Sequence, residues 1–263
     1  MIMENISVKL DIAPHLENTQ TALSIKDRFP NSAPDSDICL KLDDNGLSLI
    51  CEGMTLHGDF SKMCARVKPQ SVGSELLVRT AKIKDTNGEL RALDATAGLG
   101  EDSLLLAAAG FYVTMYEQNP IIYELLCDAK RRAEQDSLLV NIVSRMKIIC
   151  ADSIMAMQNL DFSPDVVLLD PMFPERQKSA LVKNKLQVIQ KLEMPCVNEA
   201  EMLLSAVNTK PQKLIIKRPP KGPYLASVKP DYSIAGKAVR FDCIVKPNDK
   251  KHIILKTLNK GEI

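Results

Sequence analysis

The stretch that decides the fold reads LDATAGLGED and spans residues 93–102 of a 263-residue chain. A short apolar segment, residues 91–94, leads into it, and an apolar segment of helical spacing, residues 103–109, follows it. In the order strand, glycine turn and helix, the turn lies at the carboxyl end of a strand, where open α/β sheets bind their ligands. Glycine accepts positive φ angles and lets a ligand approach the backbone, and a helix start offers unpaired N–H groups. The sequence therefore predicts a ligand-binding site that includes Asp94 at the end of the strand and Gly98 and Gly100 in the turn.

The chain after about residue 74 alternates between strand and helix periods. We expect strands at residues 91–94, 112–117, 147–151, 166–170, 213–217, 239–245 and 252–256. Helices between the first five strands imply βαβ units, right-handed crossovers and a mainly parallel sheet. Only residues 246–251, which include turn formers such as Pro247, separate the last two strands, so these should form an antiparallel hairpin. This α/β arrangement, parallel strands ending in an antiparallel hairpin, resembles the Rossmann-like sheet of class I S-adenosylmethionine (SAM) methyltransferases.

A small N-terminal region of different texture precedes this part of the chain. We expect residues 1–73 to form a β-containing appendage and residues 74–263 to form the SAM-dependent methyltransferase domain. Apolar segments at 39–42 and 47–50 flank Asp-Asn-Gly at 44–46, which is typical of a tight hairpin turn. The hairpin can be a structural appendage packed on the main domain, or it can take a direct part in substrate binding.

The composition is that of an ordinary folded protein, with 45% hydrophobic and 25% charged residues. Because 34 Lys and Arg balance 33 Asp and Glu, any basic surface must be local. Seven cysteines without a CxxC pair favour neither a disulfide framework nor a zinc site, and the three histidines lack metal spacing, so no metal is expected. We find no signal-peptide pattern and no run of about 18 apolar residues, which predicts a cytoplasmic protein without a membrane partner.

The turn at 98–102 suits either NAD or SAM, and two features favour SAM. The dinucleotide fingerprint requires glycine or alanine three positions after Gly100, where this chain has Ser103. Glu101 and Asp102 at the helix start would repel a diphosphate. Their carboxylates can instead hydrogen-bond the cationic amino-acid end of SAM. The sequence therefore predicts SAM as the cofactor.

The next two strands also end in polar residues. Glu117 lies 23 residues after Asp94, where an acidic side chain can accept the ribose hydroxyl hydrogens. Asp152 and Ser153 follow the third strand and are placed to meet the adenine amino group. Each assignment has a local alternative: Glu117 can be a solvated strand-end carboxylate, and Asp152 can be a helix N-cap.

The fourth strand ends in DPMFP, residues 170–174. This resembles the (Asp/Asn)-Pro-Pro-(Tyr/Phe) motif of methyltransferases that modify exocyclic or amide nitrogens, with methionine at the second proline. The lone pair of an aromatic amine is delocalised, so catalysis requires acceptors for its N–H hydrogens, which Asp170 and the backbone beside Pro171 can provide. Phe173 can stack on the base. In the alternative interpretation the prolines only end the strand and Phe173 belongs to the core.

Basic residues follow this motif and the fifth strand. Those expected to hold RNA phosphates are Arg176, Lys178, Lys183, Lys185, Lys217 and Arg218. A solvated helix face is the alternative for the first four, but two basic groups on the same rim favour a nucleic-acid substrate.

With DATAGLGED (94–102), DPMFPERQKSALVKNK (170–185) and IIKRPP (215–220) in this order, the chain resembles the RsmJ-type 16S ribosomal RNA guanine-N2 methyltransferases of bacteria. The resemblance covers about residues 55–245. It implies methylation of one guanine N2 in the 3′-terminal hairpin region of small-subunit RNA, with SAM as donor. By position, the donor contacts of this family fall on Glu101, Asp102, Glu117, Gln118, Asp152, Ser153 and Asp170. The resemblance alone selects RNA over DNA and guanine over adenine.

Several alternatives remain open at this stage. An adenine-N6 or protein-amide methyltransferase would use the same amine chemistry. An NAD-dependent oxidoreductase is disfavoured by Ser103 and the acidic turn, and a non-catalytic RNA-binding subunit is disfavoured by the intact motif at 170–174. The sequence does not distinguish naked RNA from an assembling or finished 30S particle, and it leaves the oligomeric state unknown.

Overall fold

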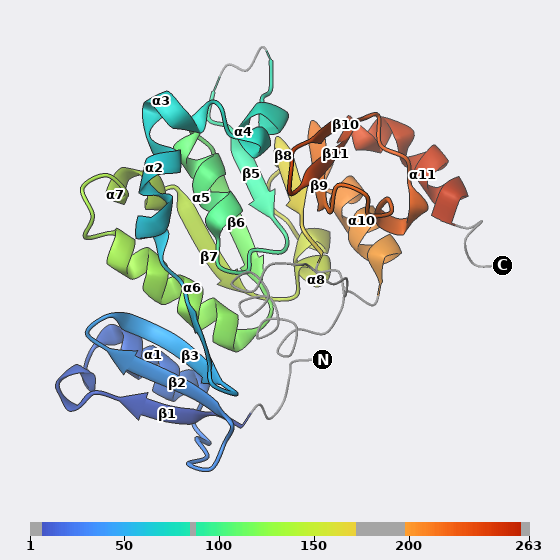
Figure 1. Cartoon of the computed structure of the whole chain (residues 1–263). Helices are drawn as coiled ribbons and strands as arrows, with labels where there is room; N and C mark the ends of the chain where they lie inside the picture. The colour runs from blue at the N-terminus through green and yellow to red at the C-terminus, as the bar shows by residue number, and fades with distance from the viewer. Residues whose placement is uncertain (1–6, 85–87, 172–197, 259–263) are drawn as a thin grey trace.

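The computed structural model describes residues 7–84, 88–171 and 198–258 and contains two β-sheets (Figure 1). The larger sheet has the strand order β10-β11-β9-β8-β5-β6-β7. Its strands are β5 (Arg91–Asp94), β6 (Tyr112–Glu117), β7 (Met146–Cys150), β8 (Val166–Leu169), β9 (Lys213–Arg218), β10 (Tyr232–Ala235) and β11 (Arg240–Val245). The five strands β5 to β9 are parallel to one another, and β11 runs antiparallel to both of its neighbours. The predicted α/β fold, parallel strands ending in an antiparallel hairpin, is confirmed.

Helices cover both faces of this sheet. The helices in this part of the chain are α2 (Cys64–Val67), α3 (Pro69–Val72), α4 (Leu76–Ala81), α5 (Glu101–Ala108), α6 (Pro120–Ala133), α7 (Val140–Val143), α8 (Ser153–Gln158), α10 (Glu199–Asn208) and α11 (Lys251–Leu258). Strand β8 shows how the faces divide, because Val166 and Leu168 pack with α4 and α5 while Val167 and Leu169 pack with α8 and α10. Strands buried on both faces explain the continuous apolar runs in the sequence.

Two details of the prediction were wrong. Residues 252–256 form part of α11 and not a strand, and the hairpin is made by β10 and β11. The run Ile253-Ile254-Leu255 suggested a strand, but only Ile254 is buried, as expected when one face of a helix packs on the protein. The sequence does not predict strand β10, because this strand is an exposed edge strand with little apolar patterning.

The smaller sheet lies at the N-terminus and has the order β1-β2-β3-β4. Its strands are β1 (Lys9–Ile12), β2 (Ile38–Asp43), β3 (Gly46–Cys51) and β4 (Met54–His57), and helix α1 (Gln20–Arg28) accompanies them. The predicted hairpin is β2–β3, where Asp43 pairs with Gly46 and the glycine has φ +97°. Figure 1 shows α6 between this sheet and the larger one. Leu47 and Leu49 share an apolar cluster with Leu125 of α6.

The order of the larger sheet determines where a ligand can bind. The chain runs outward from β5 through β6 to β7, and then returns to place β8 on the other side of β5. Such a reversal leaves a crevice at the carboxyl ends of the two strands on either side of it. Asp94 ends β5 and Asp170 follows β8, so both lie at this point.

Candidate active site

The glycine turn after β5 is tied to the end of β6. The Ala97 N–H donates to the Tyr116 carbonyl oxygen at 3.1 Å, and the Gly98 N–H donates to Glu117 Oε2 at 2.9 Å. Gly98 and Gly100 both have positive φ, at +53° and +74°. A Cβ at Gly98 would have no atom within 4 Å, whereas a Cβ at Gly100 would lie 2.6 Å from Leu126 Cδ1. Gly98 therefore leaves open space beside the backbone, and Gly100 is required by the packing of the core.

Asp94 organises this turn from inside. The residue is 2% exposed, and its carboxylate accepts hydrogen bonds from the Thr96 N–H at 3.1 Å and the Ser103 hydroxyl at 2.6 Å. Burial raises the pKa of Asp94 to about 6, although both hydrogen bonds oppose the rise. Ser103, which departs from the dinucleotide fingerprint, thus serves as the partner of this buried carboxyl group.

Glu117 connects two loops at the end of β6. The residue is 4% exposed, with Oε1 accepting from the Asn119 N–H at 2.8 Å and Oε2 from the Gly98 N–H at 2.9 Å. Burial raises its pKa to about 7 against these hydrogen bonds. Each carboxylate oxygen can accept more than one hydrogen bond, so the arrangement is compatible with a bound hydroxyl group. Gln118, the next residue, is exposed.

The third strand end carries Asp152 and Ser153. Asp152 is exposed and is the N-cap of α8, because its Oδ1 accepts the Ile154 N–H at 2.8 Å. Ser153 is buried. The local role considered for Asp152 is therefore present, and it occupies one oxygen of the carboxylate.

A lysine joins the donor turn to the end of β8. Lys217 Nζ, on β9, lies 2.6 Å from Asp102 Oδ2 and 2.9 Å from Asp170 Oδ2. A second link runs through the backbone, because the Asp170 N–H donates to Thr96 Oγ1 at 2.7 Å. Three elements, α5, β8 and β9, thus meet in a cluster that we call the Lys217 bridge: Asp102, Lys217 and Asp170.

The electrostatics of the Lys217 bridge favour the charged form of Lys217. Burial alone would lower the pKa of Lys217, but the two carboxylates raise it above its ordinary value. The Asp170 side chain is 39% exposed, yet the surrounding protein desolvates it enough to raise its pKa, and Lys217 opposes the rise. Two carboxylates around one ammonium group leave a net negative charge at the crevice.

Arg218, the second basic residue predicted at the end of β9, points inward. It is 1% exposed, and its guanidinium donates from Nε to the Pro223 carbonyl oxygen at 2.7 Å. Its Nη1 also lies 3.5 Å from Glu199 Oε1. Lys217 and Arg218 were both expected to hold RNA phosphates, but the structure places one between carboxylates and the other beneath a loop.

These residues fit SAM. The donor has an adenosine with ribose hydroxyls and a cationic sulfonium and ammonium, and the crevice has a strand-end carboxylate, a net negative charge and open space beside Gly98. The acidic turn does not suit a diphosphate. The geometry thus agrees with the cofactor expected from the sequence.

Comparison with known proteins decides the family. A family model of SAM-dependent methyltransferases matches residues 24–246. The ribosomal RNA small subunit methyltransferase J of Acinetobacter baumannii strain AYE is 37% identical over 229 residues, 82% of this chain and 80% of that protein. The enzyme of the same name from Marinobacter nauticus is 34% identical over 220 residues, 81% of this chain and 79% of that protein. The chain belongs to this methyltransferase J family.

A solved structure agrees with this assignment. The crystal structure of a SAM-dependent methyltransferase from Neisseria gonorrhoeae is 27% identical and has a TM-score of 0.72, covering 91% of this chain and 96% of that one. As a member of the methyltransferase J family, the chain is a SAM-dependent enzyme with a Rossmann-like fold.

The structure adds one residue to the site that the sequence did not indicate. Thr96 lies inside the quoted stretch, but a threonine in a turn carries no signal that it will bind a strand end 74 residues away. Pro171 is buried beside Asp170. The remaining predicted site residues lie outside the described part of the chain: Phe173, Arg176, Lys178, Lys183 and Lys185.

The described residues show neither a metal-ligand cluster nor a membrane-spanning helix. Within residues 7–84, 88–171 and 198–258, no group of three or more His, Cys, Asp or Glu side chains could hold a metal ion. In that same portion of the chain, no helix has the length and apolar character needed to cross a membrane.

Proposed function

We propose that this enzyme transfers a methyl group from SAM to the exocyclic N2 of a guanine in small-subunit (16S) ribosomal RNA. The proposal rests on one observation above the others, the Lys217 bridge, because it connects the donor turn at Asp102 with the acceptor motif at Asp170. The similarity to enzymes named ribosomal RNA small subunit methyltransferase J supports the choice of substrate.

The donor would be held at the carboxyl ends of β5, β6 and β7. When bound, SAM supplies an electrophilic methyl group on a sulfonium centre. We assign its binding to the backbone at Gly98 and Gly100 and to the side chains of Glu101, Asp102, Glu117, Gln118, Asp152, Ser153 and Asp170. Asp94 supports the turn from below through Thr96 and Ser103.

The acceptor chemistry depends on orienting a weak nucleophile. The N2 amine of guanine has a delocalised lone pair, so its N–H hydrogens need fixed acceptors that turn the lone pair outward. The Asp170 carboxylate can accept one of them, and the carbonyl group beside Pro171 can accept the other. Phe173 would stack on the base. Lys217 favours the ionised form of Asp170 and fixes one of its oxygens, so that the acceptor is in place before the base arrives.

The substrate RNA needs contacts beyond the reacting base. We assign the phosphate contacts to the basic residues after the acceptor motif: Arg176, Lys178, Lys183 and Lys185. The substrate is the small-subunit RNA or the 30S particle that contains it. Both are assembled in the bacterial cytoplasm, where we propose that the enzyme acts.

The test is transfer of a radiolabelled methyl group from SAM to small-subunit RNA and to 30S particles, both from cells that lack the protein. Nucleoside analysis should find the label in N2-methylguanosine, and comparing the two preparations identifies the assembly stage. Label in N6-methyladenosine or in a protein would overturn the choice of acceptor. Binding of SAM without transfer to any of these would overturn the proposed function.

A further inference from the structure

The loop between β9 and the short 3-10 helix η3 (Leu225–Ser227) lies beside the acceptor site. Strands β8 and β9 are parallel, with Leu169 opposite Ile216, so the residues that follow them emerge together. Asp170 and Lys217 are in contact at 2.9 Å, and the loop begins two residues later at Pro219. The loop reads PPKGPY from residue 219 to residue 224 and therefore begins close to the residue proposed to meet the reacting base.

Two arginines hold the loop in one conformation. Arg218 Nε donates to the Pro223 carbonyl oxygen at 2.7 Å from the inside. Arg240 Nη1 and Nη2 donate to the Pro220 and Gly222 carbonyl oxygens, each at 3.0 Å. Three prolines in six residues restrict φ further. The loop is consequently preorganised, which reduces the entropy lost when it binds a partner.

Arg240 also supports an exposed aromatic ring, that of Tyr224. The buried Asp242 carboxylate, 1% exposed, accepts from Arg240 Nε and Nη2, both at 2.8 Å. The Arg240 guanidinium lies over the Tyr224 ring, with its carbon 5.2 Å from the ring centroid. The Arg240 side chain is 12% exposed, whereas Tyr224 is 39% exposed. The stack thus begins at the buried carboxylate of Asp242, continues through the guanidinium of Arg240 and ends at the exposed ring of Tyr224.

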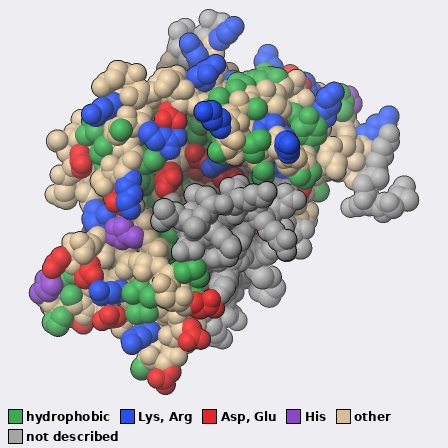
Figure 2. All heavy atoms as spheres, viewed as in Figure 1, with side chains coloured by type: hydrophobic (Ala, Val, Ile, Leu, Met, Phe, Trp, Pro, Cys, Tyr) green, Lys and Arg blue, Asp and Glu red, His purple; other side chains and the backbone are tan. Residues whose placement is uncertain are grey.

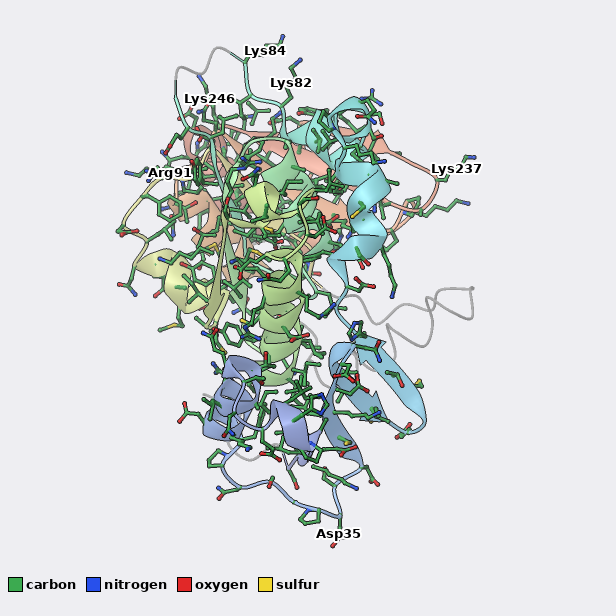
Figure 3. The ribbon with its side chains drawn as sticks, turned by 90° about the vertical axis from the view of Figure 1, so that its left-hand side faces the viewer. Asp35, Lys82, Lys84, Arg91, Lys237 and Lys246 are labelled. Atoms are coloured by element: carbon green, nitrogen blue, oxygen red, sulfur yellow. The ribbon has the colours of Figure 1, made fainter. Side chains whose placement is uncertain are left out.

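Two exposed lysines lie on the segments beside this ring, and the carboxylate in contact with η3, that of Glu199, lies 3.5 Å from Arg218 Nη1. Lys221 is exposed within the loop, and Lys237 is exposed in the turn between β10 and β11. That turn lies at the same edge of the sheet, because Arg240 pairs with Arg218 across β11 and β9. Residues 219–229 contain no Asp or Glu. Figure 3 shows Lys237 projecting well away from Lys82, Lys84, Arg91 and Lys246. Over the described part of the face in Figure 2, Lys and Arg are scattered and not continuous, so this small group has to act locally.

We propose that Tyr224, supported by Arg240, is a stacking platform for an unpaired base of the substrate RNA near the target guanine, with Lys221 and Lys237 contacting the flanking phosphates. The inference rests on the proposed function and adds a second recognition site to it. Proteins that read single-stranded RNA combine aromatic stacking with basic side chains along the backbone. The chain has no Trp, five Tyr and six Phe. The Tyr224 ring is exposed at the reacting edge of the sheet.

The first test compares Tyr224→Ala with Tyr224→Phe and with a matched control, Tyr112→Ala. Tyr112 is 45% exposed and begins β6 at the opposite edge of the sheet. The readouts are the Kd for a labelled small-subunit RNA fragment and the calorimetric Kd for S-adenosylhomocysteine. We expect Tyr224→Ala to weaken RNA binding roughly tenfold, since base stacking contributes that much per base. Tyr224→Phe and Tyr112→Ala should stay within about twofold, and the donor Kd should not change in any variant.

The second test separates charge from stacking. Lys221→Gln and Lys237→Gln should each reduce the salt dependence of RNA binding by about one counterion, while Lys84→Gln at the far end should leave it unchanged. Unchanged RNA affinity in Tyr224→Ala, with methylation by the parent enzyme intact, would overturn the platform alone. Loss of donor binding together with RNA binding would make Tyr224 a structural residue and overturn the platform as well. Failure of the parent enzyme to bind or methylate the RNA would overturn both proposals.

Discussion

Strand β9 begins with Lys213 and has a second lysine, Lys217, one residue before its end, and the two lie in different environments. Lys213, at the amino edge of the sheet, donates from Nζ to the carbonyl oxygens of Thr80 at 2.7 Å and Lys82 at 2.9 Å. Burial lowers its pKa, since these partners carry no formal charge. Lys217, four residues on at the carboxyl edge, lies between the carboxylates of Asp102 and Asp170, which raise its pKa.

The difference shows that polar side chains have different roles at the two edges of the sheet. At the amino edge, polar side chains satisfy backbone groups: Lys213 binds the end of α4, and Asp165 Oδ2 accepts the Arg91 N–H at 2.8 Å. At the carboxyl edge, charged side chains from separate elements meet one another around an open turn. Substitutions of the polar side chains at the amino edge should therefore change stability, and substitutions within the Lys217 bridge should change chemistry.

The largest expected effect is that of Asp170→Asn. Removing the charge that orients the acceptor amine should lower kcat by at least about 100-fold, the usual cost of losing one oriented group at a reacting centre. Thermal unfolding should show a folded protein. The matched change at the amino edge, Asp165→Asn, should lower the melting temperature and leave kcat within about twofold. Full activity of Asp170→Asn would remove the proposed mechanism.

A pair of glycine substitutions tests the carboxyl edge in more detail. Gly100→Ala should lower the free energy of unfolding by about 2–4 kcal/mol, because its Cβ would clash with Leu126 in a left-handed backbone conformation. Gly98→Ala also has positive φ but meets open space, so it should cost only about 1 kcal/mol. Denaturant unfolding measures both values. Calorimetry with S-adenosylhomocysteine should show weaker binding for Gly98→Ala, and equal stability losses would contradict the distinction.

The two lysines of β9 provide the most direct test of the comparison. In Lys217→Met the pKa of Asp170, already raised by desolvation, should rise further, because an ion-pair partner is lost. Activity requires the ionised carboxylate, so it is lost as the pH is lowered. In Lys217→Met this loss should begin at a higher pH than in the parent enzyme. Lys213→Met should keep the parent pH profile and lose stability instead, because two carbonyl groups lose their donor. A shifted profile in Lys213→Met would break the division between the edges.

The smallest effect concerns Glu117. Its pKa of about 7 lies above the ordinary value of a glutamate, so the folded state favours the protonated form. Its contribution to stability is therefore complete below about pH 4.5 and is lost as the pH rises to about 7. Gln is neutral throughout, so the melting temperature of the parent minus that of Glu117→Gln should decrease between about pH 5 and pH 8. A difference independent of pH would contradict the assigned pKa.

Short sequence patterns predicted much of the fold. Five parallel strands were predicted because each is a buried apolar run, and the hairpin β2–β3 was predicted because Asp-Asn-Gly favours a tight turn. Helix α11 was mistaken for a strand, since a short apolar run does not reveal its period. Strand β10 was missed because an exposed edge strand has little pattern to detect.

The sequence by itself determined the glycine turn, the carboxylates that end successive strands and the order of donor and acceptor motifs, because each depends on residues within one short segment. Only the tertiary structure decided what these residues contact. Lys217 and Asp102 are 115 positions apart, and Thr96 and Asp170 are 74 apart. A lysine after a buried strand has the same local sequence whether it meets carbonyls, carboxylates or RNA phosphates. Its role is fixed by the charges that other elements bring to it, and those positions are set by the packing of the whole sheet.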